Sequence, residues 1–113
     1  RRDREVTATW VERFDPPWLS VDGEHARALE RELCREVHPD HPLCERCVAA
    51  RAFAQRTDCD DVAFALDEGF AIVHLTWKGR AEQGVWPGTS LFDTLETLQA
   101  QMALDHEDWT RDA

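Results

Sequence analysis

The chain has no tyrosine and no asparagine, and Lys78 is the only lysine among its 13 basic residues. It contains one methionine and a single isoleucine. Arginine supplies the remaining basic residues, and this bias follows GC-rich codons. We therefore expect a bacterial protein from a GC-rich genome, and we do not interpret the arginines as ligands for nucleic acid.

Long apolar runs are also absent. No stretch approaches the ~20 apolar residues needed to span a bilayer, and no signal peptide is visible. We expect a cytoplasmic protein without a membrane partner. The 113 residues, 42% of them hydrophobic, suffice for a single domain with its own core. Within it we expect residues 1–19 as an irregular or edge-strand lead-in and residues 105–113 as a polar tail.

Positive charge is scarce relative to negative charge. The formal net charge is −10 at pH 7, from 13 basic and 23 acidic residues. No basic patch stands apart from the acids, which argues against binding to a phosphate backbone. A basic protein partner would be attracted instead, because net charge steers such encounters. Solubility is the commoner role of such a charge, and the sequence leaves the oligomeric state open.

One helix is predicted over residues 23–37, directly before the proline-rich segment 38–42. Ser20 or Asp22 can serve as its N-cap, and the prolines that follow prevent its continuation. Four apolar residues recur at helical spacing and should form the buried stripe: Ala26, Leu29, Leu33 and Val37.

A β-hairpin is predicted from the segments DVAFAL (61–66) and FAIVHLTW (70–77). Gly69 lies between them and suits the left-handed position of a three-residue loop. Counting outward from that loop places Val62 opposite His74. Both faces of the hairpin are apolar, so we expect both to be covered within the domain.

The remaining elements complete the expected fold. Residues 47–56 are ambiguous between helix and strand, and we favour a strand. Ser90 can cap a final helix with a buried stripe of Leu91, Leu95, Leu98 and Met102. We therefore expect an α+β fold: an N-terminal helix, a two- or three-stranded antiparallel sheet containing the 61–66/70–77 hairpin, and a C-terminal helix.

Cysteine and histidine cluster between the first helix and the next element. Cys34, His38, Cys44 and Cys47 would supply a Cys3His set for structural zinc, with His41 as a substitute ligand. The two halves are closer in sequence than the ~12–20 residues typical of zinc modules. Cys44 and Cys47 follow a proline-rich turn rather than beginning a helix, which disfavours a thioredoxin-type site. We favour packed thiols and no cofactor, with structural zinc as the alternative.

A second candidate cluster combines carboxylates with a histidine. Asp60 and Asp61 precede the hairpin, and the predicted register places Asp60 diagonal to His74 and Asp58 opposite Lys78. Such a set could orient an imidazole or hold a divalent cation. No nucleophile or glycine-rich phosphate loop accompanies it. A metal-dependent hydrolase is therefore disfavoured, and we assign no catalytic residue.

Three blocks of the sequence resemble a group of small bacterial proteins: DCDDVAFAL, IVHLTWKGRAEQGVWP and LFDTLETLQAQMALD. That group shares D-C-D-D-V, H-L-T-W-x-G-x-x-E and W-P motifs. The matching positions are Asp58, Asp60, Asp61, His74, Trp77, Gly79, Glu82, Trp86 and Pro87. The group has no assigned activity, so the resemblance implies no mechanism. It does not extend to Cys34, Cys44 or Cys47.

These features favour a small acidic protein-binding module of the immunity or antitoxin kind. Tryptophan is enriched among interface anchors, and the chain has five. The expected binding surface comprises His74, Trp77, Trp86, Asp60 and Asp61, and the expected partner is a basic protein. A zinc-stabilised structural or adaptor domain is the alternative.

Overall fold

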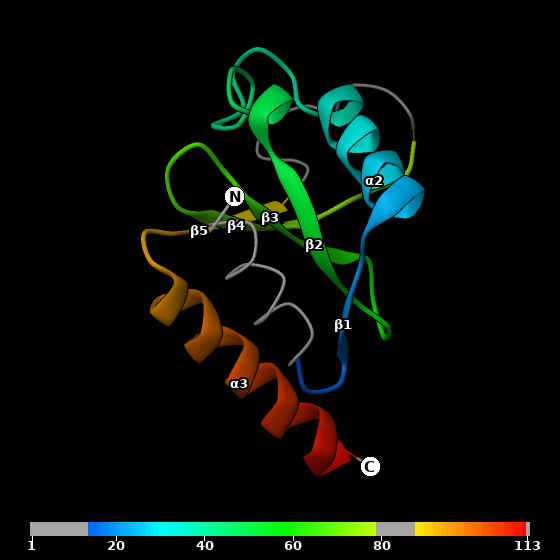
Figure 1. The fold of residues 1–113 in the computed structure, drawn as a ribbon, viewed down its shortest axis with the longest axis vertical. Helices are drawn as coiled ribbons and strands as arrows, with labels where there is room; N and C mark the ends of the chain where they lie inside the picture. The colour runs from blue at the N-terminus through cyan, green and yellow to red at the C-terminus, as the bar shows by residue number, and fades with distance from the viewer. Residues whose placement is uncertain (1–13, 79–87, 113) are drawn as a thin grey trace.

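A five-stranded antiparallel sheet with one helix on each face forms the part of the chain that the structure describes (Figure 1). The structure is a computed structural model and describes residues 14–78 and 88–112. The strands follow one another across the sheet in chain order: β1 (Trp18–Ser20), β2 (Arg51–Arg56), β3 (Asp61–Ala65), β4 (Phe70–His74) and β5 (Gly88–Phe92). The helices are α2 (Gly23–Glu36), the short 3-10 helix η1 (Cys47–Ala49) and α3 (Leu95–Asp112).

The α+β class is confirmed, but a sheet of two or three strands was too small a prediction. Residues 51–56 do form a strand, whereas residues 47–49 form a 3-10 turn. Strand β5 was not predicted, and for β1 the prediction was only an irregular or edge-strand lead-in over residues 1–19, of which residues 1–13 lie outside the described residues. Each edge strand pairs with only one neighbour, and β1 has only three residues. The sequences of both strands lack the alternation of apolar and polar residues that marks a half-buried strand.

Helix α2 confirms the predicted N-terminal helix. Its four stripe residues are at most 8% exposed and pack against β2, β3 and β4. Asp22 is the N-cap residue, although its side chain makes no capping hydrogen bond. Val37 is extended and ends the helix before the prolines. Local spacing was sufficient here because the buried stripe and the stop signal lie within one segment.

The predicted hairpin register is wrong by one residue. Ala65, not Leu66, pairs with Phe70. The Leu66 amide instead donates to the carbonyl of Gly69 at 3.0 Å, so Leu66 belongs to the turn. Gly69 adopts φ +80°, and a side chain there would approach the Phe92 carbonyl of β5 to 2.6 Å. The turn therefore requires glycine for its conformation and for the close passage of β5.

The corrected register changes which residues share a face of the sheet. Val62 lies opposite Val73, and both pack with Phe64 in the cluster covered by α2. Ala63 and Ile72 point to the other side, into the cluster covered by α3. The expectation that both apolar faces are buried is confirmed, with one helix on each face (Figure 1).

The C-terminal helix begins later than predicted. Ser90 is part of β5, and the helix begins after Thr94, whose side chain exchanges hydrogen bonds with Thr97. This arrangement resembles a capping box, with threonine in place of the usual acid. Leu91 consequently lies on the edge strand and is 52% exposed, whereas Leu98 and Met102 are buried as predicted.

Residues 105–112 continue α3 rather than forming a separate polar tail. Asp105 anchors this half of the helix: its carboxylate accepts a hydrogen bond from the buried Trp18 indole at 3.0 Å. It also lies 3.4 Å from the Arg56 guanidinium of β2 and accepts a bond from Gln101. The contact joins residues 87 positions apart, which is why helical spacing alone did not reveal it.

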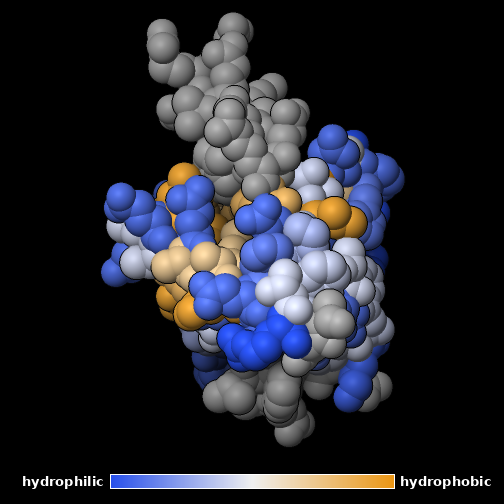
Figure 2. Space-filling view, turned by 90° about the horizontal axis from the view of Figure 1, so that it is seen from below, coloured by the Kyte–Doolittle hydropathy of each residue, from blue (hydrophilic) through white to orange (hydrophobic). Residues whose placement is uncertain are grey.

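Seen from below the view of Figure 1, the surface is mostly hydrophilic, with hydrophobic side chains showing in limited areas (Figure 2). Neither α2 nor α3, as described, is long and apolar enough to cross a membrane.

We predict that Asp105→Ala lowers the free energy of unfolding by about 2 kcal/mol, because it leaves the buried Trp18 indole without an acceptor. Chemical denaturation should measure the loss. Asp108→Ala is the matched control, since Asp108 pairs with Arg111 on the exposed side of the same helix. Its effect should stay within about 0.5 kcal/mol. Equal effects of the two substitutions would contradict the anchoring role of Asp105.

Candidate functional site

The candidate site lies where β3 begins and β4 ends, and we call it the strand-end surface: Asp60, Asp61, His74 and Trp77. Asp61 and His74 face each other in the ladder, with His74 Nδ1 2.8 Å from Asp61 Oδ1. Their side chains are 47% exposed for His74 and 25% exposed for Asp61. The predicted partner of His74 was Asp60; the corrected register makes it Asp61.

The other two aspartates have mainly structural contacts. The Asp60 carbonyl accepts a hydrogen bond from the Leu75 amide at 3.3 Å, which continues the pairing beyond the ladder. Asp58 forms a two-pronged ion pair with Arg56, at 2.8 and 2.7 Å, rather than the predicted pair with Lys78. The hydrogen bonds from Arg56 lower the pKa of Asp58. Asp58 is therefore paired with Arg56 of β2 and does not contribute to the strand-end surface.

Trp77 is in a left-handed backbone conformation, with φ 61°. This region costs a non-glycine residue about 1–2 kcal/mol, so it persists only where other contacts impose it. The Trp77 amide donates to Glu36 Oε2 at 2.7 Å, and the preceding Thr76 amide donates to Oε1 at 2.8 Å. One carboxyl group at the end of α2 therefore fixes the backbone that presents the tryptophan, whose ring remains partly exposed (46% for the residue).

Glu36 is fully buried, and Glu32 one turn earlier is only 2% exposed. Burial, and then a hydrogen bond with Glu32, raise the pKa of Glu36 to about 7. The two backbone amides act in the opposite direction by stabilising the carboxylate. Glu32 in turn lies 3.3 Å from Arg35. Glu36 thus titrates near neutral pH while holding the chain at Trp77.

Glu32 and Glu36 were not predicted as functional residues, although the sequence carries a signal for them. Glu32 lies three and Glu36 seven positions after Leu29, and both fall on the buried face of α2. A charged residue at core spacing in a helix needs a partner, because an unpaired buried carboxylate is costly. The pattern identifies such residues, but it does not identify Thr76 and Trp77 as the groups that Glu36 binds.

Four of the five predicted surface residues come from this one end of the β3–β4 hairpin: Asp60, Asp61, His74 and Trp77. Trp86 lies outside the described residues, as do Gly79, Glu82 and Pro87 of the resembling blocks. Carboxylate, imidazole and a half-exposed indole together make a surface that is suited to polar and aromatic contacts with another molecule.

The predicted zinc ligands are distributed from the end of α2 to η1: Cys34 lies in the last turn of α2, His38 and Cys44 lie in the turns that follow, and Cys47 begins η1. His38 Nδ1 accepts a hydrogen bond from the Asp40 amide, and buried His41 accepts one from the Leu43 amide. Within residues 14–78 and 88–112, no three His, Cys, Asp or Glu side chains converge as a metal-ligand group. The set Cys34, His38, Cys44 and Cys47 is therefore not assembled in this arrangement, and the histidine nitrogens instead satisfy turn amides.

Comparison with known proteins adds no assignment: no family model, curated protein or solved structure matches the chain. The resemblance to small bacterial proteins stays a prediction from the sequence blocks.

We predict that Glu36 makes the protein less stable as the pH rises. The folded chain holds the Glu36 proton more tightly than the unfolded chain, where the pKa is near 4.5. The stabilisation is complete below pH 4.5 and is lost as the pH rises through about 7, a change on the order of 3 kcal/mol. Urea denaturation of wild type and Glu36→Gln across this range should show a difference that varies with pH.

A Glu32→Gln variant provides the second arm of that test. It replaces a carboxyl group that favours protonated Glu36 with an amide that can donate to the Glu36 carboxylate, so the pH dependence should shift to lower pH without disappearing. A difference between Glu36→Gln and wild type that stays constant from pH 4.5 to about pH 8 would rule out titration of Glu36 in this range.

Proposed function

We propose that this chain is a non-catalytic protein-binding module whose strand-end surface binds a basic protein partner, in the manner of an immunity protein or antitoxin. The supporting observation is Trp77, a half-exposed tryptophan in a left-handed conformation imposed by a buried carboxyl group. Strained residues of this kind concentrate at functional sites.

The energetics of Trp77 favour recognition over packing. Its conformation is unfavourable, yet 46% of the residue remains in contact with solvent, so full burial does not compensate for the strain. Indole side chains supply much of the binding energy at interfaces, because they bring a large apolar area and one hydrogen-bond donor with little rotamer entropy. A partner that covered this ring would gain the area that the fold leaves exposed.

The acidic residues of the strand-end surface indicate the kind of partner. Asp60 is exposed and Asp61 is bound to His74 beside it, within a chain of net charge −10. Acidic groups at the edge of an apolar contact favour a partner with lysine or arginine in the complementary positions. The same net charge accelerates encounters with a basic protein at low ionic strength.

Catalysis by the Asp61–His74 pair is less well supported. The pair could orient an imidazole, but its nearest nucleophilic candidate in sequence is Cys59. Burial raises the pKa of the Cys59 thiol, which is opposite to the shift that activates a nucleophilic cysteine. The surface therefore offers recognition groups without an activated nucleophile among the residues described.

We predict that Trp77→Gly abolishes partner binding while changing the free energy of unfolding by no more than about 1 kcal/mol. Glycine adopts positive φ without strain, so the variant removes the ring and keeps the backbone turn. Tagged wild-type protein and the variant should be compared by affinity capture from host lysate at low salt, followed by mass spectrometry. Only the wild type should retain a stoichiometric basic protein.

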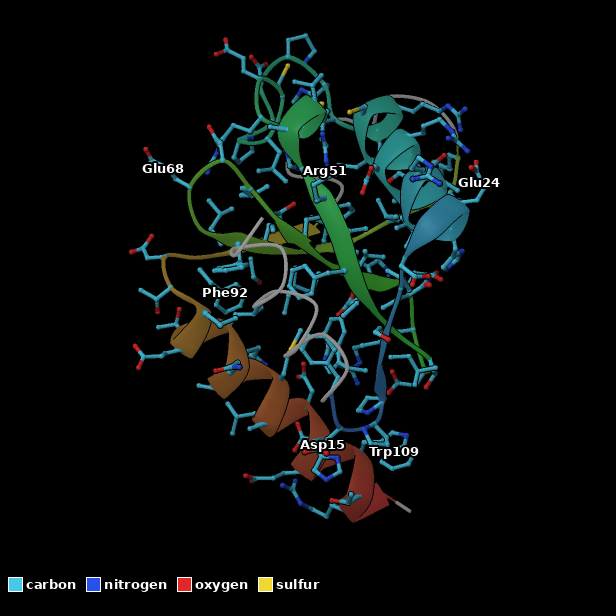
Figure 3. The ribbon with its side chains drawn as sticks, viewed as in Figure 1. Asp15, Glu24, Arg51, Glu68, Phe92 and Trp109 are labelled. Atoms are coloured by element: carbon cyan, nitrogen blue, oxygen red, sulfur yellow. The ribbon has the colours of Figure 1, made fainter. Side chains whose placement is uncertain are left out.

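Trp109→Ala is the matched control, because Trp109 is 38% exposed and lies at the far end of α3 (Figure 3). It should capture the same protein as the wild type, and the complex should weaken at about 0.5 M salt. Equal capture by Trp77→Gly and wild type, or the absence of any stoichiometric protein, would count against the proposed function.

A further inference from the structure

Two cysteines that were considered as zinc ligands form a separate feature on the α2 side of the sheet. Cys34 is exposed on the last turn of α2, and Cys47 is the first residue of η1 and 6% exposed. The two side chains are neighbours, and the interaction with Cys34 contributes to a raised pKa of the Cys47 thiol. Both line one cavity of about 370 Å³, together with Val48 and Ala50. The Cys44 side chain is not part of the lining described.

We propose that Cys34 and Cys47 are a reversible redox pair, which a small anionic disulfide converts into an intramolecular disulfide between α2 and η1. The pair is distinct from the strand-end surface and does not depend on the protein-binding proposal. An accessible thiol beside a second thiol that can resolve the first oxidation product is the usual arrangement in a redox-sensitive site.

The environments of the two thiols assign their order of reaction. Cys34 is accessible to a reagent, whereas Cys47 is buried and its thiol donates to the Cys44 carbonyl at 3.6 Å. Burial, and then the neighbouring Cys34, raise the pKa of Cys47 to about 12. Cys47 is therefore slow to react with a reagent in solution, but it shares the lining of one cavity with Cys34.

The cavity also indicates the chemistry of the reagent. Its lining includes three arginines, Arg31, Arg35 and Arg51, and one carboxylate, Glu30. Glu30 accepts a hydrogen bond from the Ala52 amide, and the Arg51 guanidinium donates to the Val48 and Ala50 carbonyls. Arg51 is labelled near the start of β2 in Figure 3. Arg31 is paired with Glu24 at 3.1 Å and Arg35 with Glu32 at 3.3 Å, whereas Arg51 donates to main-chain carbonyls and keeps its charge available for a carboxylate of a small disulfide.

The reaction is two successive thiol–disulfide exchanges. The Cys34 thiolate attacks one sulfur of the reagent, its S–S bond breaks, and one reduced thiol leaves. The Cys47 thiolate then attacks the Cys34 sulfur, the Cys34–Cys47 bond forms, and the second reagent thiol leaves. The two cysteine protons end on the two released thiols. The protein dithiol is oxidised by two electrons, and the reagent disulfide is reduced by two.

The new bond would close a loop from Cys34 to Cys47 that contains the proline-rich turns. Cross-linking a loop of this length restricts the unfolded chain and should raise the melting temperature by about 10 °C. Reduction with dithiothreitol should return the melting temperature to its starting value.

The test treats the reduced full-length chain with oxidised glutathione, alkylates the remaining thiols with N-ethylmaleimide and maps the peptides by mass spectrometry. Wild type should lose two alkylatable thiols and yield a Cys34–Cys47 peptide. Cys47→Ser should stop at a glutathione adduct on Cys34, and Cys34→Ser should give neither product. Cys44→Ser is the matched control from the same segment and should form the Cys34–Cys47 bond at the wild-type rate.

Three results would overturn the proposal. These are a stable Cys34 adduct in wild type with no internal disulfide, a bond from Cys34 to Cys44 or Cys59, and the absence of any reaction. A melting temperature that is unchanged after the Cys34–Cys47 bond has formed would overturn its stabilising role.

Discussion

The carboxyl group of Glu36 is the contact on which the arrangement of α2 and the end of β4 depends. It accepts the amides of Thr76 and Trp77, 40 and 41 residues further along the chain. Burying a carboxyl group is costly unless its hydrogen bonds are replaced, and here two backbone donors replace them. The contact fixes one position of α2 on the sheet and imposes the left-handed turn that exposes Trp77. Among the described residues, no buried side-chain nitrogen or oxygen lacks a partner.

A second buried carboxylate performs the corresponding role on the opposite face. Asp105 binds the Trp18 indole and the Arg56 guanidinium, and it joins α3 to β1 and β2. The apolar clusters beneath the two helices supply most of the burial, but apolar contacts are non-directional and would permit other positions. Hydrogen bonds to buried polar groups select one position, because an alternative packing would leave those groups unpaired. Both helices of this α+β fold are held by this combination.

The last turn of α2 connects the two regions that we associate with function. Glu36 faces the sheet and holds the backbone at Trp77, whereas Cys34, two residues earlier, faces the cavity beside η1. The helical turn separates them onto a buried and an exposed side. The strand-end surface combines acid, imidazole and indole groups, and the cavity combines thiols with arginines. The two sets of side chains are chemically different, which is why we treat them as separate sites.

Elements whose signals are local could be derived from the amino-acid sequence alone. The stripe of α2 and the turn at Gly69 follow from periodicity and backbone preference, and they led to the α+β class. The hairpin register could not be derived in this way, because both faces are apolar and a one-residue shift leaves each face apolar. Strand β5 has its partner in β4, across a long connection. The partners of Glu36, Asp105 and Cys47 were decided only by tertiary structure, because a hydrogen bond or thiol contact between distant segments has no period in the sequence.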